Sequence, residues 1–234
     1  MRRDVILERF FTGLISGDRN QSRRVLEEIL DADCGPVEVI SKLFWPTLER
    51  IQNLYRSDEI SAMAHHYSTR LLRCFVDQMQ MRLPISERLG KKCMVLCGPE
   101  ESEELGAQIT SDLLDAAGYD VYFSGGGIAN DEIVEEIGKM DTDLLVIFGV
   151  TPAAVPFTRL LIDQLREIGV CPKLQIAVGG GVFNRAEGLA QEIGADLWAS
   201  SPQELCQQIV EQPGRRMDEA QRTVGRRRRK SAAA

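Results

Sequence analysis

The sequence predicts an α/β fold in two parts, an N-terminal four-helix bundle and a C-terminal parallel sheet that is covered by helices. Residues 1–83 predict only helices, because their apolar residues recur at helical spacing. From Cys93 onward, short apolar runs alternate with amphipathic helical segments, which is the pattern of βαβ units. Residues 84–92, PISERLGKK, are polar and contain Pro84 and Gly90, so they predict an interdomain linker.

Four helices are expected in the bundle. The first two end near residues 17 and 31, and Pro36 starts the third, which Pro46 is expected to kink. Ser57 or Asp58 is expected to cap the fourth helix. The predicted apolar stripe of that helix comprises Ile60, Met63, Ala64, Tyr67, Leu71, Cys74, Phe75 and Gln78.

The C-terminal part begins with one clear βαβ unit. Its first strand is Met94–Cys97, its helical pattern opens at Gly106 and ends at Gly118, and its second strand is Val121–Phe123. The remaining elements are expected near residues 131–140, 143–148, 155–168, 173–178, 185–193, 196–199 and 202–211. Five strands with short returns predict a flavodoxin-like, doubly wound, five-stranded parallel sheet over residues 93–212.

Composition favours a cytoplasmic globular protein. Apolar residues make up 44% of the 234 residues and charged residues 27%, and no apolar run approaches the roughly 20 residues of a membrane helix. Acidic residues interrupt the N-terminus at once, so it makes a poor signal peptide. Six cysteines without metal-binding spacing predict reduced core residues.

Charge is divided unevenly along the chain. Residues 213–234 carry eight basic and two acidic side chains, a net charge of +6. Because the whole chain has a net charge of −7, residues 1–212 have a net charge of −13. An acidic body is not a nucleic-acid-binding surface. The basic tail is expected to be disordered and to bind polyanions weakly and without specificity, the alternative being a merely solvated terminus.

The loop after the first strand, GPEESEELG, carries a family resemblance. The order strand, D-x-H-x-x-G, helix, strand resembles the cobalamin-binding domain of corrinoid proteins. The aspartate of that motif falls at Glu101, the histidine at Glu103 and the glycine at Gly106. In the family the histidine ligates cobalt from below, and a carboxylate is a poorer match for that metal. The resemblance therefore implies the fold without the usual cobalt coordination.

The bundle sequence PTLERIQNLYRSDEISAMAHH is similar to that of light-sensing, cobalamin-dependent repressors. Their signature is a tryptophan, nine residues, then Glu-His, which places Tyr55, His65 and His66 at the three positions. The resemblance implies that Tyr55 covers the upper face of the corrin and that His66 can take the cobalt. Both histidines lie off the predicted apolar stripe, on opposite sides of it. The alternative is that both are ordinary surface histidines.

Further positions of the sheet both match the family and depart from it. Gly179, Gly180 and Gly181 resemble the family's glycine pair, where missing side chains let the nucleotide tail lie against the backbone. Thr151 matches a Thr-Pro after the third strand, but the serine of an S-x-L motif that binds the tail falls at Ile147. The resemblance adds Ser124, Gly125 and Phe183 to the expected cofactor-binding residues.

Other chemistries fit the residues less well. The first loop has no G-x-G-x-x-G and presents carboxylates, which would repel a dinucleotide's pyrophosphate. Glu101, Glu103 and Glu104 could bind a hard metal, but an acidic helix start is the favoured alternative. Only two histidines are present, both on one helix, so no catalytic pairing is apparent and a non-enzymatic role is favoured.

The leading hypothesis is a sensory or regulatory module. Cobalamin, with adenosylcobalamin among its forms, or else haem or a bilin, would bind between bundle and sheet. The signal would pass to a regulatory partner protein, and the chain could also form a homo-oligomer. The first alternative is a corrinoid shuttle component of a methyltransferase system, and the second is an assembly domain that binds nothing.

Overall fold

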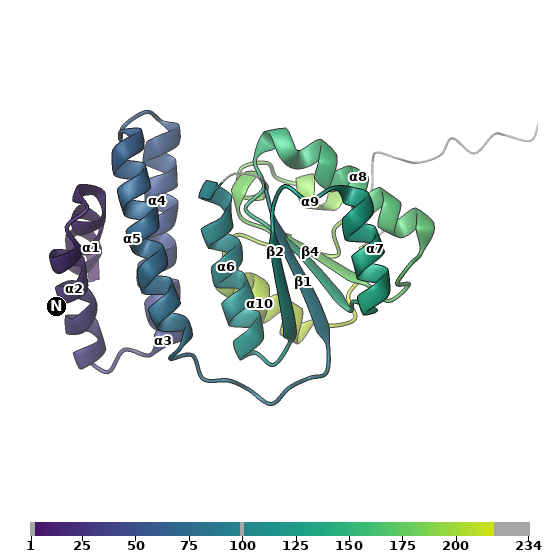
Figure 1. The fold of residues 1–234 in the computed structure, drawn as a ribbon, viewed down its shortest axis with the longest axis horizontal. Coiled ribbons are helices and arrows are strands. Elements are labelled where there is room, and N and C mark those ends of the chain that lie inside the picture. The colour runs from purple at the N-terminus through teal and green to yellow at the C-terminus, as the bar shows by residue number, and fades with distance from the viewer. Residues whose placement is uncertain (1–2, 99–100, 218–234) are drawn as a thin grey trace, which may run out of the picture.

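The computed structural model describes residues 3–98 and 101–217, and within this range it confirms a helical bundle followed by a flavodoxin-like domain (Figure 1). The bundle contains α1 (Arg3–Ser16), α2 (Arg19–Asp31), α3 (Pro36–Val39), a π-helical turn (Ile40–Phe44), α4 (Trp45–Arg56) and α5 (Ala62–Gln80). Because α3, the π-helical turn and α4 follow one another without a break, the described bundle has four helical rods, as predicted.

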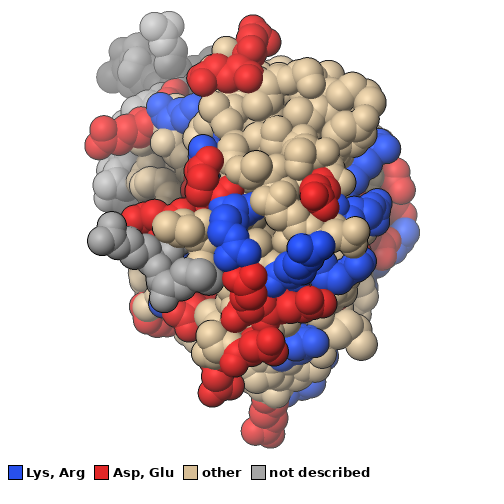
Figure 2. All heavy atoms as spheres, turned by 90° about the vertical axis from the view of Figure 1, so that its left-hand side faces the viewer, with Lys and Arg blue, Asp and Glu red and all other residues tan. Residues whose placement is uncertain are grey.

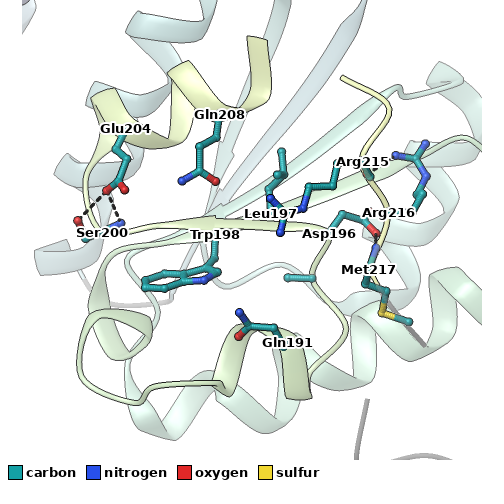
Figure 3. A pocket seen from close by; sticks show the side chains of 11 residues that line it. Gln191, Asp196, Leu197, Trp198, Ser200, Glu204, Gln208, Arg215, Arg216 and Met217 are labelled. Atoms are coloured by element: carbon teal, nitrogen blue, oxygen red, sulfur yellow. Dashed lines mark hydrogen bonds between the residues drawn. The ribbon is translucent and has the colours of Figure 1, made fainter. Parts of the chain in front are cut away.

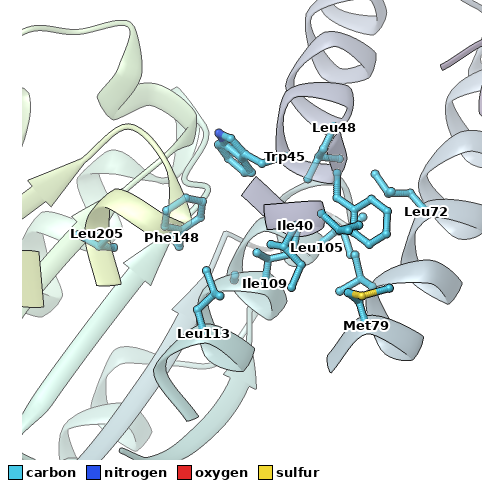
Figure 4. Close-up of a cluster of buried hydrophobic side chains, with 14 of the residues drawn as sticks. Ile40, Trp45, Leu48, Leu72, Met79, Leu105, Ile109, Leu113, Phe148 and Leu205 are labelled. Carbon is cyan, nitrogen blue, oxygen red and sulfur yellow. The ribbon is translucent and has the colours of Figure 1, made fainter. Parts of the chain in front are cut away.

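The third rod is irregular just before Pro46. The Trp45 N–H donates to the carbonyl of Ile40, which lies five residues back instead of four. The irregularity was expected as a kink caused by Pro46, and the structure resolves it into one wide π-helical turn. This turn places the indole of Trp45 toward the α/β domain (Figure 4).

Two features of α5 differ from the prediction. Its N-cap is Ser61, whose hydroxyl accepts from the N–H of Ala64, whereas Ser57 ends α4 and Asp58 adopts a left-handed conformation in the turn. The predicted apolar stripe is also wrong, since Met63, Tyr67 and Cys74 are exposed. The buried face comprises His65, Ser68, Leu71, Leu72, Phe75, Val76 and Met79. Because α5 packs against α4 and α1, the face that it buries is not the face with the most apolar residues.

The sheet is five-stranded and wholly parallel among the described residues, in the order β2-β1-β3-β4-β5. Its strands are β1 (Lys92–Cys97), β2 (Asp120–Gly125), β3 (Leu144–Phe148), β4 (Gln175–Gly179) and β5 (Leu197–Ala199). Its helices are α6 (Glu101–Ala116), α7 (Asn130–Met140), α8 (Val155–Ile168), α9 (Leu189–Glu192) and α10 (Pro202–Glu211). This strand order is that of the predicted doubly wound fold.

Each face of the sheet has its own core. The core on the α6–α10 face is continuous with the core of the bundle, whereas α7 and α8 cover a separate core on the other face. Successive residues of β3 point alternately into the two cores, so Phe148 belongs to the first and Ile147 to the second.

Two boundaries in the α/β domain differ from the prediction. Helix α6 already begins at Glu101, because the acidic residues that precede the apolar pattern favour a helix N-terminus. The helix expected at 185–193 is instead a 3-10 turn (Gly181–Asn184) followed by the short α9, since Gly188 adopts a positive φ between them.

The bundle packs against α6 through an apolar joint. Ile40 and Trp45 on the bundle side face Leu105 and Ile109 of α6 (Figure 4). Beside this joint, Arg73 pairs with Glu104 at 3.1 Å, and the Gln108 amide donates to Asp77 at 2.6 Å.

The predicted linker is fastened to the α/β domain. The N–H of Ser86 donates to the Ala116 carbonyl and that of Leu89 to the Gly118 carbonyl, each at 2.8 Å. The first bond satisfies a carbonyl that the last turn of α6 leaves open, and the second satisfies one in the turn that follows the helix.

The outer face of the bundle carries charges of both signs, interspersed with uncharged areas (Figure 2). Arg9 pairs with Glu28 at 2.7 Å and Arg50 with Glu8 at 2.5 Å. The predicted basic tail lies outside the described residues from position 218 onward. No helix within the described ranges is long and apolar enough to span a bilayer.

Candidate functional site

A pocket lies where the bundle meets the carboxyl ends of β1, β3 and β4. It has a cavity volume of about 160 Å³. The bundle lines it with Trp45, Gln52, Tyr55, Arg56 and His65, and the α/β domain with Glu103, Gly106, Phe148, Gly149, Val150, Thr151, Pro152, Gly181 and Arg185. The pocket brings together six of the residues that the sequence predicted to bind a cofactor, namely Tyr55, His65, Glu103, Gly106, Thr151 and Gly181.

The bundle wall of this pocket is an aromatic stack. The rings of Tyr55 and His65 lie 4.0 Å apart between centroids, at an interplanar angle of 18°. Tyr55 is near the end of α4 and His65 near the start of α5, so the short turn between the helices brings them face to face. His65 is only 7% exposed, whereas Tyr55 is 39% exposed.

Two arginines add positive charge to the rim. Burial is the main cause that lowers the pKa of Arg56, and the nearby charge of Arg185 lowers it further. The charge of Glu49 acts in the opposite direction and raises the pKa of Arg56. The pKa of Glu49 is itself raised by burial, although its hydrogen bond with Asn184 lowers it. The rim therefore favours an anionic or polar group beside the aromatic wall.

Glu103 stands in the first turns of α6 and is 6% exposed. Its carboxylate lies against Gly98, where a β-carbon would collide with it. Burial, with the charges of Glu104 and Glu103 as smaller causes, raises the pKa of the nearby Cys97 to about 12. The thiol therefore stays protonated at neutral pH, and this corner of the site is acidic without being nucleophilic.

Three glycines surround the ring of Phe148, and we call their shared space the glycine slot. A β-carbon added to Gly106, Gly179 or Gly180 would lie 3.1, 2.7 or 2.6 Å from the nearest ring carbon of Phe148. Gly180 also has φ of +63°, which favours glycine. The Trp45 indole meets the ring edge-on, with centroids 5.6 Å apart. Phe148 itself is 0% exposed.

Several predicted site residues lie elsewhere. His66, the predicted metal ligand, is exposed and is not among the lining residues of the pocket, and Ser124 is exposed at the end of β2. Phe183 is 2% exposed and packs in the core on the α7–α8 face, so it does not line this pocket, and its contact with a ligand stays a prediction. The side chain of Glu101 lies outside what the structure describes. No group of three or more His, Cys, Asp or Glu side chains could hold a metal among the described residues.

The pocket residues that were not predicted from the sequence include Trp45, Arg56, Phe148 and Arg185. Phe148 carried one usable signal, since it is the last residue of a buried strand, where α/β sheets bind ligands. Trp45 carried another, because it directly precedes Pro46 at the expected irregularity.

A second, larger cavity of about 680 Å³ opens on the other face of the sheet, between α7 and α8. It is lined mainly by apolar residues, Ile147 and Phe157 among them, and by the loop that contains Gly125. Gly125, expected near the cofactor, therefore lies on this side.

A third cavity, of about 500 Å³, lies at the β5 edge (Figure 3). Trp198, Gln191 and Gln208 line it, and Arg215 and Arg216 close one side. Beneath it, buried Asp196 pairs with Arg166 at 2.6 Å and accepts from the N–H of Met217 at 2.9 Å. The segment after α10 is therefore bonded to the body as far as Met217.

Two family models match the chain, both described as a B12 binding domain. One covers residues 91–205, the α/β domain, and the other covers residues 6–79, the bundle. The gap between the two matches, residues 80–90, includes most of the predicted linker, so the two parts of this fold correspond to the two matched domains.

Curated relatives extend over most of the chain. Monomethylamine corrinoid protein 1 of Methanosarcina mazei is 20% identical over 87% of this chain and 95% of its own length. Dimethylamine corrinoid protein 2 of Methanosarcina acetivorans is 22% identical over 72% of this chain and 78% of its own. The solved monomethylamine corrinoid protein of Methanosarcina barkeri matches 90% of this chain with a TM-score of 0.66 and 16% identity, which supports the fold alone.

Proposed function

This chain belongs to the B12-binding domain family with an N-terminal helical part, and on that premise we propose that it carries a corrinoid in a methyl-transfer system with a partner protein. The observation that carries the proposal is its likeness to a monomethylamine corrinoid protein over nearly the whole of both chains, bundle included. The alternative from the sequence is thereby favoured over a sensor.

The pocket between bundle and sheet is the proposed place of the macrocycle. Tyr55 and His65 would face one side of the ring, and the backbone at Gly149 and Gly181 would face the other. A cavity of about 160 Å³ is smaller than the roughly 300–1,000 Å³ of ordinary ligand pockets. Binding therefore requires the bundle to withdraw from the sheet.

The residues do not fit the usual lower coordination of the cobalt. Glu103 offers a hard carboxylate oxygen at the position of the expected imidazole. Its side chain is directed against Gly98. We therefore assign no role in cobalt chemistry to this loop.

Incubation with hydroxocobalamin, followed by gel filtration and a visible spectrum, tests the proposal. We expect close to one corrinoid per chain and a spectrum that differs from that of the free compound. Tyr55→Ala should weaken binding about tenfold, which corresponds to roughly 1.4 kcal/mol. Tyr122→Ala changes an exposed tyrosine outside the lining of this pocket and should not weaken it. A chain that emerges without corrinoid would contradict the proposal.

A sensory module is the second candidate. It is favoured by the Tyr55–His65 stack, because withdrawal of the bundle would uncover the ring of His65, which is now only 7% exposed. Illumination of the chain loaded with adenosylcobalamin separates the two candidates. A light-dependent change in hydrodynamic radius would favour the sensor, and methyl transfer from bound methylcobalamin to an added acceptor system would favour the carrier.

A further inference from the structure

We propose, resting on the corrinoid-binding function above, that this chain binds its corrinoid with the nucleotide tail outside the sheet. It should therefore accept tail-less corrinoids of the cobinamide class as readily as complete cobalamins, and cobalamin should keep its own base on the cobalt. The proposal follows from how the glycine slot is filled.

The glycine slot is occupied by the chain itself. The family resemblance implies that the tail lies against a glycine pair, but here Phe148 packs its ring against Gly179 and Gly180 and against Gly106 across from them. Ring carbons lie as near as 2.6 Å to the place that a β-carbon would take, so the ring is in direct contact with the backbone. An aromatic ring of the protein thus takes the space that an aromatic base would need.

Phe148 is also held in this position. Its backbone is paired in the middle of the sheet, opposite Cys97 on one side and Gly179 on the other. Trp45 covers the ring from the bundle, at 71° between the ring planes, and is itself 8% exposed. The contacts of the ring with Gly106, Gly179 and Gly180 lie wholly within the α/β domain, so withdrawal of the bundle does not by itself empty the slot.

Little space remains beside the ring for a tail on this face of the sheet. The cavity beside Trp45, Ile109 and Pro202 has a volume of about 30 Å³. An apolar cavity of about 150 Å³ accommodates a single benzene ring. A fused bicyclic base with its ribose and phosphate therefore needs more room than this cavity provides.

The lower-ligand position agrees with the filled slot. A tail base that leaves the cobalt gives up a coordination bond, and an imidazole of the protein is well suited to compensate for that loss. Glu103 at this position removes the main gain from extracting the tail. Both features disfavour extraction of the tail. Phe148 fills the space that the tail would occupy, and Glu103 is a poor replacement for the base on the cobalt.

Binding of two compounds by the unmodified chain tests the proposal first. We expect dissociation constants for hydroxocobalamin and diaquocobinamide that agree within about threefold, and a spectrum of bound methylcobalamin that remains base-on. Cobinamide binding at least tenfold weaker than cobalamin binding, or a base-off spectrum, would overturn the inference while leaving the proposed function intact. Binding of neither compound would overturn the proposed function and the inference together.

Reopening the slot provides the second test. Phe148→Ala should create an aromatic-sized cavity that binds 5,6-dimethylbenzimidazole, detected as a rise in melting temperature that the unmodified chain does not show. Phe183→Ala removes an equally buried ring from the other core and should show no such rise. Equal stabilisation of all three proteins by the probe would count against the assignment of the slot.

A variant that carries both substitutions, one in the slot and one at the lower-ligand position, provides the third test. In Glu103→His with Phe148→Ala, cobalamin should become base-off and bind at least tenfold more tightly than cobinamide. If Phe148→Ala does not fold, Phe148→Leu retains most of the apolar volume while removing the aromatic ring. A combined variant that still binds both compounds equally and base-on would contradict the inference.

Discussion

The two faces of the sheet differ at the carboxyl ends of the strands. On the α7–α8 face a cavity of about 680 Å³ stays open, whereas on the bundle face Phe148 fills the corresponding space and leaves about 160 Å³ beyond it. Ile147 lines the open cavity and Phe148 fills the closed one, although they are consecutive residues of β3. Because adjacent strand residues point to opposite faces, one residue can close one side of a sheet and leave the other unchanged.

The largest effect is expected from replacing Phe148, the residue that fills the space on the bundle face of the sheet. Phe148→Ala should lower the free energy of unfolding by about 3–5 kcal/mol, as large-to-small core changes do. In a Trp198→Phe background, the fluorescence of Trp45 should also shift, because its ring contact with Phe148 is lost. Urea unfolding and emission spectra check both. Phe183→Ala should destabilise the chain without shifting that emission, and a similar shift in it would contradict the comparison.

A smaller effect is expected from Asp112 on the bundle side of α6. Burial, followed by the charges of Asp77 and Asp115, raises the pKa of Asp112 to about 7. The folded chain thus retains a proton that the unfolded chain releases near pH 4, so stability should fall as pH rises from about 4 to about 7 and then level off.

Asp112→Asn should therefore be more stable than the unmodified chain at pH 8, by about 1–2 kcal/mol after allowing for partial exposure. The difference should vanish below pH 4. Denaturation with urea at a series of pH values measures it. A constant difference across this range would show that Asp112 does not titrate as proposed.

The β5 edge extends the comparison to a region held by polar bonds. The Gln175 amide donates to the carbonyls of Gln212 and Arg215, and the N–H of Met217 donates to Asp196. Ending the chain after Gly214 should cost about 1–2 kcal/mol, because it removes two of these three bonds. Ending it after Met217 should leave stability unchanged and remove weak, salt-sensitive binding to polyanions. Thermal unfolding and a DNA mobility assay at low salt distinguish the two truncations.

The smallest effect is expected from the ion pair beside the apolar joint. Arg73→Gln should change stability by only about 0.5 kcal/mol, since both partners of the Arg73–Glu104 pair are partly exposed. A double-mutant cycle with Glu104→Gln measures the coupling. A coupling of several kcal/mol would mean that charge, and not apolar packing, holds the bundle to the sheet.

The sheet could be predicted because its strands are short apolar runs between turn residues, and β3 is a clear example. The direction of Phe148 could not, because a strand buried on both faces shows no alternation that would mark one face as the binding side. The resemblance to corrinoid proteins, which the loop containing Glu103 indicated, was confirmed by the match of a B12 binding domain to residues 91–205.

In the bundle, the helices were predictable and their faces were not. His65 seemed to lie off the apolar stripe of α5 because Met63 and Tyr67 outweighed it in a count of apolar residues. The actual buried face is selected by contacts with α4, where Tyr55 offers a ring for stacking. Tertiary packing of this kind cannot be read from the periodicity of a single helix.

The π-helical turn at Ile40–Phe44 has an evolutionary consequence. Such a turn is one residue longer than the α-helical turn it replaces, and each residue rotates the helix by about 100°. If one residue of this turn were deleted, the helix would stay regular, but the part from Trp45 onward would rotate by about 100° relative to the part before it. The indole of Trp45 would then point away from the sheet. The deletion or insertion of a single codon could therefore uncover or cover the ring of Phe148 without substituting any residue that lines the pocket.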